Sequence, residues 1–168
     1  MNRRAFLAGG VAAAGQSAPG SGRIDCQSHL FCPELLALLE KRKNSPSAYR
    51  KGSDLYVAIE GWHRRVLPKH SDIAAKLADM DAAGIEKTAL SVNDPGPELF
   101  ARDGPAIARL LNDYIAGIVK SHPARFFGLC VLPVQNTDEA LKELERCVKT
   151  GEALVAFALH VAGRPSMH

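Results

Sequence analysis

The sequence lacks several features that would each define a class of protein. Its four cysteines form no Cys-x-x-Cys pair and no zinc-finger spacing, so neither motif is available. It has no basic cluster longer than the three residues His63-Arg64-Arg65, and its formal net charge is only +3, which gives no support for nucleic-acid binding. There is no internal repeat and no apolar run long enough to span a bilayer. What remains is a chain of 168 residues, enough for one domain with a hydrophobic core.

The N-terminal segment has the pattern of an export signal. Residues Met1–Leu7 fit the twin-arginine sequence Arg-Arg-x-Phe-Leu, and a short, mildly apolar run follows over Ala8–Ala14. Small residues offer a cleavage site before Gly15, and Gln16–Gly22 is typical of a flexible linker. We therefore expect residues 1–22 to be a signal and linker, residues 23–168 to fold, and the protein to reach the periplasm or the cell exterior. The alternative is an accidental arginine pair in a disordered tail.

The cysteines themselves allow two expectations. Export would expose Cys26 and Cys32 to an oxidising environment, where they could form a disulfide, although the sequence gives no geometry for it. Cys130 and Cys147 are interpreted as small core residues, because unpaired cysteine is among the most buried residue types.

The stretch Arg23–Phe31 places polar side chains at alternate positions. Asp25, Gln27 and His29 would share one face of a β-strand, because alternate side chains of a strand point the same way. Buried polar groups are costly unless they are paired or bind a ligand, so metal binding is one reading of this pattern, and the spacing alone does not favour it over the next. The alternative is that His29 only makes a hydrogen bond at the end of the strand.

Downstream, the sequence predicts helices and strands in alternation. Helical patterns occur at 33–43, 71–84 (with Ser71 as N-cap), 103–121 and 137–151, and strands at 23–31, 86–92, 126–132 and 153–159. Only a possible short strand or hairpin is expected within 44–69, around 55–59. This order predicts a parallel sheet of four strands with right-handed crossovers. Asn93 follows the second of these strands in a turn-like sequence, and is either a substrate contact or an ordinary turn residue.

Two helices carry explicit predictions about their faces. The helix at 103–121 should bury a stripe of apolar residues and leave Asn112 and Asp113 solvated. The helix at 137–151 should bury Leu141, Leu144 and Val148, and end at Gly151.

The motif Asp25-x-Gln27-x-His29, followed by Phe31-Cys32-Pro33-Glu34, resembles the Asp-x-His-x-His…Pro-Glu opening of the amidohydrolase-related metal enzymes. The resemblance is nearest to the aminocarboxymuconate-semialdehyde decarboxylase branch and covers Arg23 to about Pro165. Further segments match in the same order: Leu77–Ile85, Leu111–Tyr114, Arg125–Leu129, Val131–Pro133, Glu143–Val148 and Val155–Val161. The resemblance implies a partial (β/α)8 TIM barrel, of which this chain would supply the N-terminal half, because a complete barrel needs about 250 residues.

The resemblance also implies a divalent metal, usually zinc. His29 and His160 match ligand positions, whereas Gln27 occupies a position where the family has histidine, which should weaken zinc binding. Cys32 is a possible substitute ligand. The family's later catalytic histidine and metal-binding aspartate lie beyond the position of His168. Asn93 and Arg164 are candidate contacts for a substrate carboxylate.

The implied activity is decarboxylation or hydrolysis of a small unsaturated or aromatic carboxylate. The alternative is a half-barrel remnant, or a partner-dependent fragment, that keeps the fold without activity. An uncovered half-barrel surface would also favour self-association.

Overall fold

The computed structural model describes residues 22–149 and 154–157. Four parallel strands form its main sheet in the order β1-β5-β6-β7, with bounds Ile24–Leu30 (β1), Lys87–Val92 (β5), Phe126–Cys130 (β6) and Leu154–Phe157 (β7). Each strand pairs with the next parallel strand along the chain, and a helix lies in every connection. The four-stranded parallel sheet is therefore confirmed, and its topology is that of part of a (β/α) barrel.

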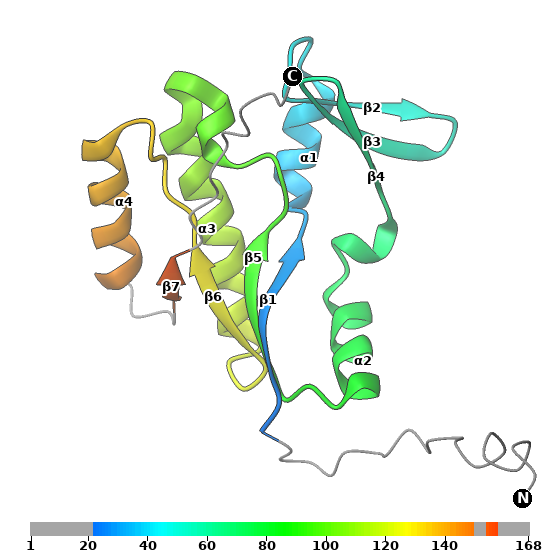
Figure 1. Cartoon of the computed structure of the whole chain (residues 1–168), viewed down its shortest axis with the longest axis vertical. Coiled ribbons are helices and arrows are strands. Elements are labelled where there is room, and N and C mark those ends of the chain that lie inside the picture. The colour runs from blue at the N-terminus through cyan, green and yellow to red at the C-terminus, as the bar shows by residue number, and fades with distance from the viewer. Residues whose placement is uncertain (1–21, 150–153, 158–168) are drawn as a thin grey trace, which may run out of the picture.

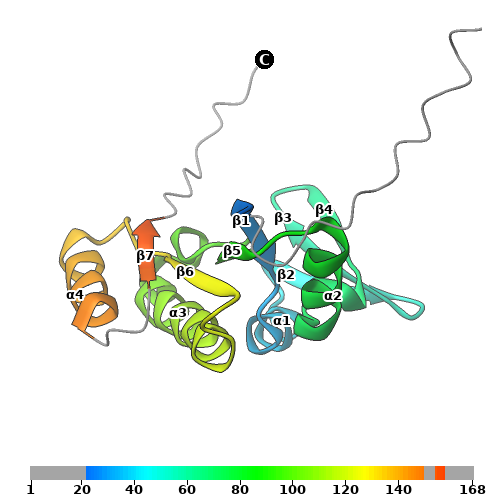
Figure 2. The same ribbon diagram turned by 90° about the horizontal axis from the view of Figure 1, so that it is seen from below.

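The helices lie on one side of this sheet. They are α1 (Pro33–Glu40), α2 (Ile73–Ala83), α3 (Gly104–Ser121) and α4 (Thr137–Lys149), as Figure 1 shows. Seen from below, the strands form a row with the helices along one side of it (Figure 2). No helix of the described residues covers the opposite face, which corresponds to the inside of a barrel. Within the same residues, no helix combines the length and the apolar character needed to cross a bilayer.

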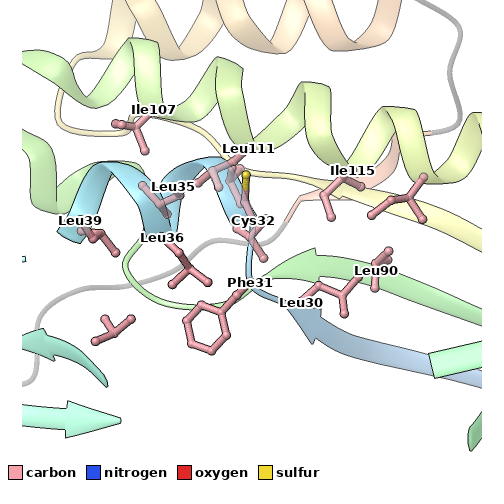
Figure 3. Close-up of a cluster of buried hydrophobic side chains, with 14 of the residues drawn as sticks. Leu30, Phe31, Cys32, Leu35, Leu36, Leu39, Leu90, Ile107, Leu111 and Ile115 are labelled. Atoms are coloured by element: carbon pink, nitrogen blue, oxygen red, sulfur yellow. The ribbon is translucent and has the colours of Figure 1, made fainter. Parts of the chain in front are cut away.

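The core forms where the sheet meets α1 and α3. Leu30 and Leu90 project from adjacent strands and are almost completely buried. They meet leucines and isoleucines of the two helices (Figure 3), namely Leu35, Leu36, Leu39, Ile107, Leu111 and Ile115. Burying each such side chain contributes roughly 2 kcal/mol, so this layer fixes the helices against the strands.

A second sheet inserts between α1 and α2. Its antiparallel strands are β2 (Ser47–Lys51), β3 (Asp54–Ile59) and β4 (Trp62–Val66), in the order β2-β3-β4. Buried Ala48 and Val57 belong to the hydrophobic core, and β2 contacts α1. Glu60 and Gly61 both have positive φ, as a two-residue type I′ hairpin loop requires. The sequence predicted only one strand or hairpin here, and we call the observed three-stranded insertion the arm.

The start of α2 differs by one residue from the prediction. Asp72, not Ser71, is the N-cap: its carboxylate accepts a hydrogen bond of 3.1 Å from the backbone N–H of Ala75. Asp and Ser are comparable N-cap residues, so composition alone could not choose between neighbours.

The predicted faces of α3 and α4 are partly wrong. Asn112 is not solvated but only 1% exposed, whereas its neighbour Asp113 is exposed. In α4 the buried residues include Glu143, while Leu141 and Val148 are 58% and 65% exposed. The face of α4 that packs inward therefore carries Ala140, Glu143 and Cys147, and not the apolar stripe that the sequence predicted.

A hydrogen-bond network explains why Asn112 and Glu143 are buried. The side-chain amide of Asn112 donates to the Val131 carbonyl (2.9 Å) and to Glu143 Oε1 (2.8 Å), and its oxygen accepts from Val131 N–H (2.9 Å). Arg146 donates two further bonds to the Glu143 carboxylate, at 2.8 and 2.6 Å. Burial raises the pKa of Glu143, but the bonds from Arg146 and Asn112 outweigh it, so that the pKa lies below its usual value. The network ties α3, α4 and the end of β6 together.

The four cysteines, which all lie among the described residues, form no disulfide, so the possible bridge between Cys26 and Cys32 is not observed. Cys130 and Cys147 are buried, as predicted, and so is Cys32, whereas Cys26 is exposed. The proposed export signal, Gly151, His160 and Arg164 lie outside the described residues.

Candidate functional site

The first strand carries a β-bulge within the polar motif. Asp25 pairs with Thr88 of β5 and Ser28 pairs with Leu90, and the register of the pairing shifts between them. The backbone N–H of Gln27 donates to the Asp25 carboxylate at 3.2 Å, inside the bulge. The regular alternation of side chains is therefore interrupted between Asp25 and Ser28.

The bulge turns Asp25 toward the helices. Asp25 shares the face of its partner Thr88, which is also the face of Leu90 and the hydrophobic core. Ser28 lies on this face too and accepts a hydrogen bond from Lys76 of α2. Burial lowers the pKa of Lys76, and the nearby Asp25 carboxylate opposes this shift. The expectation that Asp25, Gln27 and His29 would all share one face is wrong for Asp25.

His29 lies on the other face, the inner side of the partial barrel. It pairs with Ser91 of β5, and its Nδ1 lies 2.8 Å from Ser91 Oγ. Ser91 is only 2% exposed, whereas His29 is exposed. A buried hydroxyl therefore holds one ring nitrogen of a histidine whose other edge points away from the core.

A guanidinium group reaches the same end of the sheet from the arm. Arg64 of β4 donates from Nη1 to Asn93 Oδ1 at 2.8 Å, and its guanidinium carbon lies 5.9 Å from the centre of the Phe31 ring. Asn93 continues the pairing of β5 with β1, because its N–H donates to the Leu30 carbonyl at 2.8 Å. The segment that follows the arm is held nearby by a bond of 2.9 Å from Phe31 N–H to the His70 carbonyl. Arg64 is thus placed over the carboxyl ends of β1 and β5.

These side chains form what we call the edge site: His29, Ser91, Asn93 and Arg64. Ser91 and Asn93 are two residues apart on one strand, which corresponds to about 7 Å and to the same face. Active sites of barrel enzymes lie at the carboxyl ends of the strands, the position of this cluster. The edge site therefore holds an imidazole through Ser91 and a guanidinium through Asn93, two residues apart in the sequence.

The metal-binding potential of the described residues is limited. Among them, no three His, Cys, Asp or Glu side chains lie close enough together to hold an ion. His29 nevertheless fits the role of one ligand, because a metal-binding histidine usually has its other ring nitrogen hydrogen-bonded. Gln27 is an exposed residue of the bulge and brings an amide oxygen to the same strand. His160 would follow β7, which is separated from β1 by β5 and β6.

Cys32 does not suit the role of substitute ligand. It is buried beside α1, and its thiol donates to Glu34 Oε2 at 3.2 Å. Burial raises the pKa of this thiol to about 11, so that the thiolate required for metal binding is scarce at neutral pH.

Sequence reasoning missed two members of the edge site. Ser91 stands inside an apolar strand, where a hydroxyl gives no distinct signal. Arg64 lies in the long connection between two helices, a kind of segment that often contributes to substrate pockets, but its sequence context assigns it no particular role. Only the arm's fold places it beside Asn93.

Comparison with known proteins finds sequence similarity to decarboxylases. No family model matches the sequence. Gamma-resorcylate decarboxylase of Rhizobium sp. (strain MTP-10005) is 41% identical over 129 residues, which is 76% of this chain and 35% of the relative. The enzyme of the same name from Polaromonas sp. is 44% identical over 72 residues, or 42% of this chain and 22% of the relative. A Dictyostelium discoideum 2-amino-3-carboxymuconate-6-semialdehyde decarboxylase is 45% identical over 47 residues, 28% of this chain and 13% of the relative.

Solved structures agree with the sequence relatives. The 2,6-dihydroxybenzoate decarboxylase from Rhizobium is 28% identical with a TM-score of 0.53, over 81% of this chain and 37% of that one. A dihydroxybenzoic acid decarboxylase from Polaromonas, with bound manganese and the inhibitor 2-nitroresorcinol, gives 28% and 0.58 over the same shares. The Metarhizium anisopliae IDCase shares the fold, with a TM-score of 0.67 at 17% identity, over 76% of this chain and 39% of that one.

The fold and the edge site define the class: the described residues form part of a (β/α) barrel with polar groups at the carboxyl ends of its strands. The chain is homologous to decarboxylases of small carboxylates, in agreement with the resemblance of its motifs to the amidohydrolase-related family. It spans about a third of the length of the Rhizobium relative.

Proposed function

We propose that this chain carries part of the active site of a divalent-metal-dependent decarboxylase acting on a small aromatic carboxylate. The observation that carries the proposal is the edge site, where His29 contacts Ser91 and Arg64 contacts Asn93 at the carboxyl ends of two adjacent strands. The names of the relatives supply the substrate class, since gamma-resorcylate and 2,6-dihydroxybenzoate are aromatic carboxylates. The alternative substrate is an unsaturated, non-aromatic carboxylate, such as the one in the name of the Dictyostelium relative.

Metal ligands are proposed from the motif and the geometry together. His29 would bind through Nε2, Gln27 through its amide oxygen, and His160 from the segment after β7. A bound divalent ion supplies polarisation of a substrate oxygen. The manganese in the Polaromonas structure and the oxygen donor of Gln27 favour a harder ion than zinc, because carboxylate and amide oxygens suit Mn²⁺ or Mg²⁺ better than they suit Zn²⁺.

Arg64 is the proposed carboxylate-binding residue. Its guanidinium can offer parallel N–H groups to a carboxylate, a geometry that lysine cannot reproduce. Asn93 then acts mainly through Arg64, because its Oδ1 accepts the bond from Nη1 and so fixes the direction of the guanidinium. The Phe31 ring beneath Arg64 supplies an apolar support. Arg164, beyond β7, remains a second proposed carboxylate contact.

The experiment compares two neighbouring arginines. Arg64→Met removes the proposed carboxylate contact, whereas Arg65→Met removes an exposed residue whose partner is Asp54 at 2.9 Å. With Mn²⁺ present, we expect Arg64→Met to weaken binding of 2,6-dihydroxybenzoate by roughly 10- to 100-fold, since a bond to a charged group contributes about 1.5–3 kcal/mol. Arg65→Met should change it less than about 2-fold. Calorimetry measures both; equal effects of the two variants would refute the role of Arg64.

A half-barrel that keeps the fold without activity is the second candidate, and Gln27 is the observation that favours it. An amide is a poorer zinc ligand than imidazole, and no cluster of three His, Cys, Asp or Glu ligands exists in the described residues. Gln27→His discriminates the two. Tight Zn²⁺ binding gained by this variant, measured by elemental analysis of the purified chain, supports metal-enzyme ancestry; no gain supports the inactive alternative.

Export and association are separate proposals. We propose that residues 1–22 direct twin-arginine export, which a fusion to a reporter tests: replacing Arg3 and Arg4 by lysines should retain the reporter in the cytoplasm. We also propose that the uncovered inner face of the sheet favours self-association. Light scattering of the purified chain tests this, and a monomer at all concentrations would contradict it.

A further inference from the structure

We infer that Ser91 is a positioning residue that fixes the tautomer of His29, with the proton on Nδ1 and the lone pair on Nε2. The inference deepens the proposed function, because it rests on His29 being a metal ligand there. Its physical content is narrower, however: a buried hydroxyl on one strand determines which nitrogen of an imidazole on the next strand carries hydrogen.

The register of the sheet creates the contact. His29 and Ser91 are direct partners in the parallel pairing of β1 with β5, so their side chains leave the sheet on the same side. The distance from Nδ1 to Oγ is 2.8 Å, within the range of a good hydrogen bond. Ser91 is 2% exposed, so water competes poorly for its hydroxyl.

The direction of the bond follows from the role proposed for His29. Ser91 Oγ also lies 3.5 Å from the carbonyl oxygen of Val92, which is too long for a hydroxyl hydrogen bond and does not fix where its hydrogen points. If Nε2 binds the metal ion, as proposed above, Nδ1 carries the hydrogen and donates it to Ser91 Oγ. The neutral imidazole then carries its lone pair on Nε2, the nitrogen farther from the buried face.

The bulge in β1 makes this arrangement possible. Because the alternation is reset between Asp25 and Ser28, Ser28 faces Lys76 of α2 while His29 faces Ser91. Two neighbouring residues of one strand thus have separate hydrogen-bond partners on opposite faces. This separation supplies a matched control, since each hydroxyl can be removed without touching the other.

Nitrogen-15 NMR of the metal-free full chain, labelled at histidine, reads the tautomer directly. At a pH where the ring is neutral, we expect a protonated Nδ1 and an unprotonated Nε2 for His29, assigned by comparison with a His29→Gln variant. Ser91→Ala should move both nitrogen shifts toward an averaged or reversed tautomer. Ser91→Thr keeps the hydroxyl and should restore the original pattern, and Ser28→Ala should leave it unchanged.

Metal titration supplies the second readout. Removing an outer partner of a metal-binding histidine typically weakens metal affinity by about 10- to 100-fold, and we expect this loss of Mn²⁺ affinity in Ser91→Ala but not in Ser28→Ala. A wild-type His29 protonated on Nε2, or a Ser91→Ala spectrum identical to wild type, would overturn the inference. Failure of the wild-type chain to bind Mn²⁺ or Zn²⁺ would instead count against the proposed function and leave the tautomer result standing.

Discussion

Replacing Asn112 by aspartate should destabilise the fold in a manner that depends on pH. Aspartate has nearly the same shape, and its carboxylate can still accept the hydrogen bond from Val131 N–H. It presents an oxygen, however, where the amide nitrogen now donates to the Val131 carbonyl and to Glu143 Oε1 at 2.9 and 2.8 Å. Two bonds are thereby replaced by two repulsive contacts in a site where Asn112 and Glu143 are 1% and 4% exposed.

The magnitude follows from two competing costs. Two carboxylates about 4 Å apart repel by about 4 kcal/mol at an effective dielectric constant near 20. Protonating one of them instead costs about 4 kcal/mol at pH 7 but only about 1.5 kcal/mol at pH 5, for a usual pKa near 4. Adding about 1 kcal/mol for each of the two lost donors gives a loss of roughly 6 kcal/mol near pH 7.5. Near pH 5 the protonated carboxyl recovers one donor, so the loss falls to roughly 2–3 kcal/mol.

The sign of this dependence can be stated from the folded-state pKa. The proton that the introduced carboxylate shares with Glu143 is held more tightly in the folded than in the unfolded variant, so its pKa is raised and its contribution to stability is lost as the pH rises. In the wild-type chain the pKa of Glu143 is lowered, so its contribution is complete above about pH 5 and falls only in acid. Between the two conditions the wild-type network should therefore show almost no change.

Urea unfolding followed by circular dichroism, at about pH 5 and about pH 7.5, measures both free energies of unfolding. Asp113→Asn is the matched control, because it replaces a carboxylate by an amide at the adjacent residue, the reverse of the change in Asn112→Asp. It removes only the ion pair between exposed Asp113 and Arg146. We expect that control to cost less than about 1 kcal/mol at either pH. A loss in Asn112→Asp that is small, or equal at both pH values, would show that the network does not have the geometry described here.

Three further outcomes are expected. Gly84→Ala should lower the free energy of unfolding by about 1 kcal/mol in urea, because Gly84 ends α2 with φ of 65° and alanine is strained there; no loss would argue against this left-handed cap. Leu111→Ala should cost about 3 kcal/mol by the same assay, since this side chain is 0% exposed, while Leu141→Ala on the exposed face of α4 should cost far less; equal costs would contradict the assigned faces. A native-state thiol titration near pH 8 should show rapid reaction of exposed Cys26 and slow reaction of Cys32, whose buried thiol has a pKa of about 11; a fast phase that survives Cys26→Ser would refute this.

The strand and helix order was predictable because hydrophobic periodicity reports it directly. The helix expected at 103–121 is observed at Gly104–Ser121, since Ile107, Leu111 and Ile115 recur on one face. The faces of α4 were not predictable. Glu143 is buried only because Asn112, a residue on another helix, and Arg146 satisfy its carboxylate, and no local pattern records a partner so distant in sequence.

The candidate site, like the fold, could be predicted only in part. The position of His29 near the end of a strand could be predicted from the motif, and the strand is where it was expected. The β-bulge that turns Asp25 away from the face of His29 could not be predicted, because the alternation of side chains was expected to continue through the motif. Arg64 reaches Asn93 only through the fold of the arm, in which Glu60 and Gly61 form a tight hairpin loop. The roles of His160 and Arg164 stay predictions.

The arm has a consequence for how such an enzyme diversifies. Its strands pair only with one another among the described residues, yet one of its side chains reaches the end of the main sheet. If Arg64 binds the substrate carboxylate as proposed, substitutions along β4 would alter which acid is selected, while the hydrogen bonds between β1 and β5, and with them the orientation of His29, stay intact. Selectivity and catalytic geometry can evolve on separate pieces of the chain.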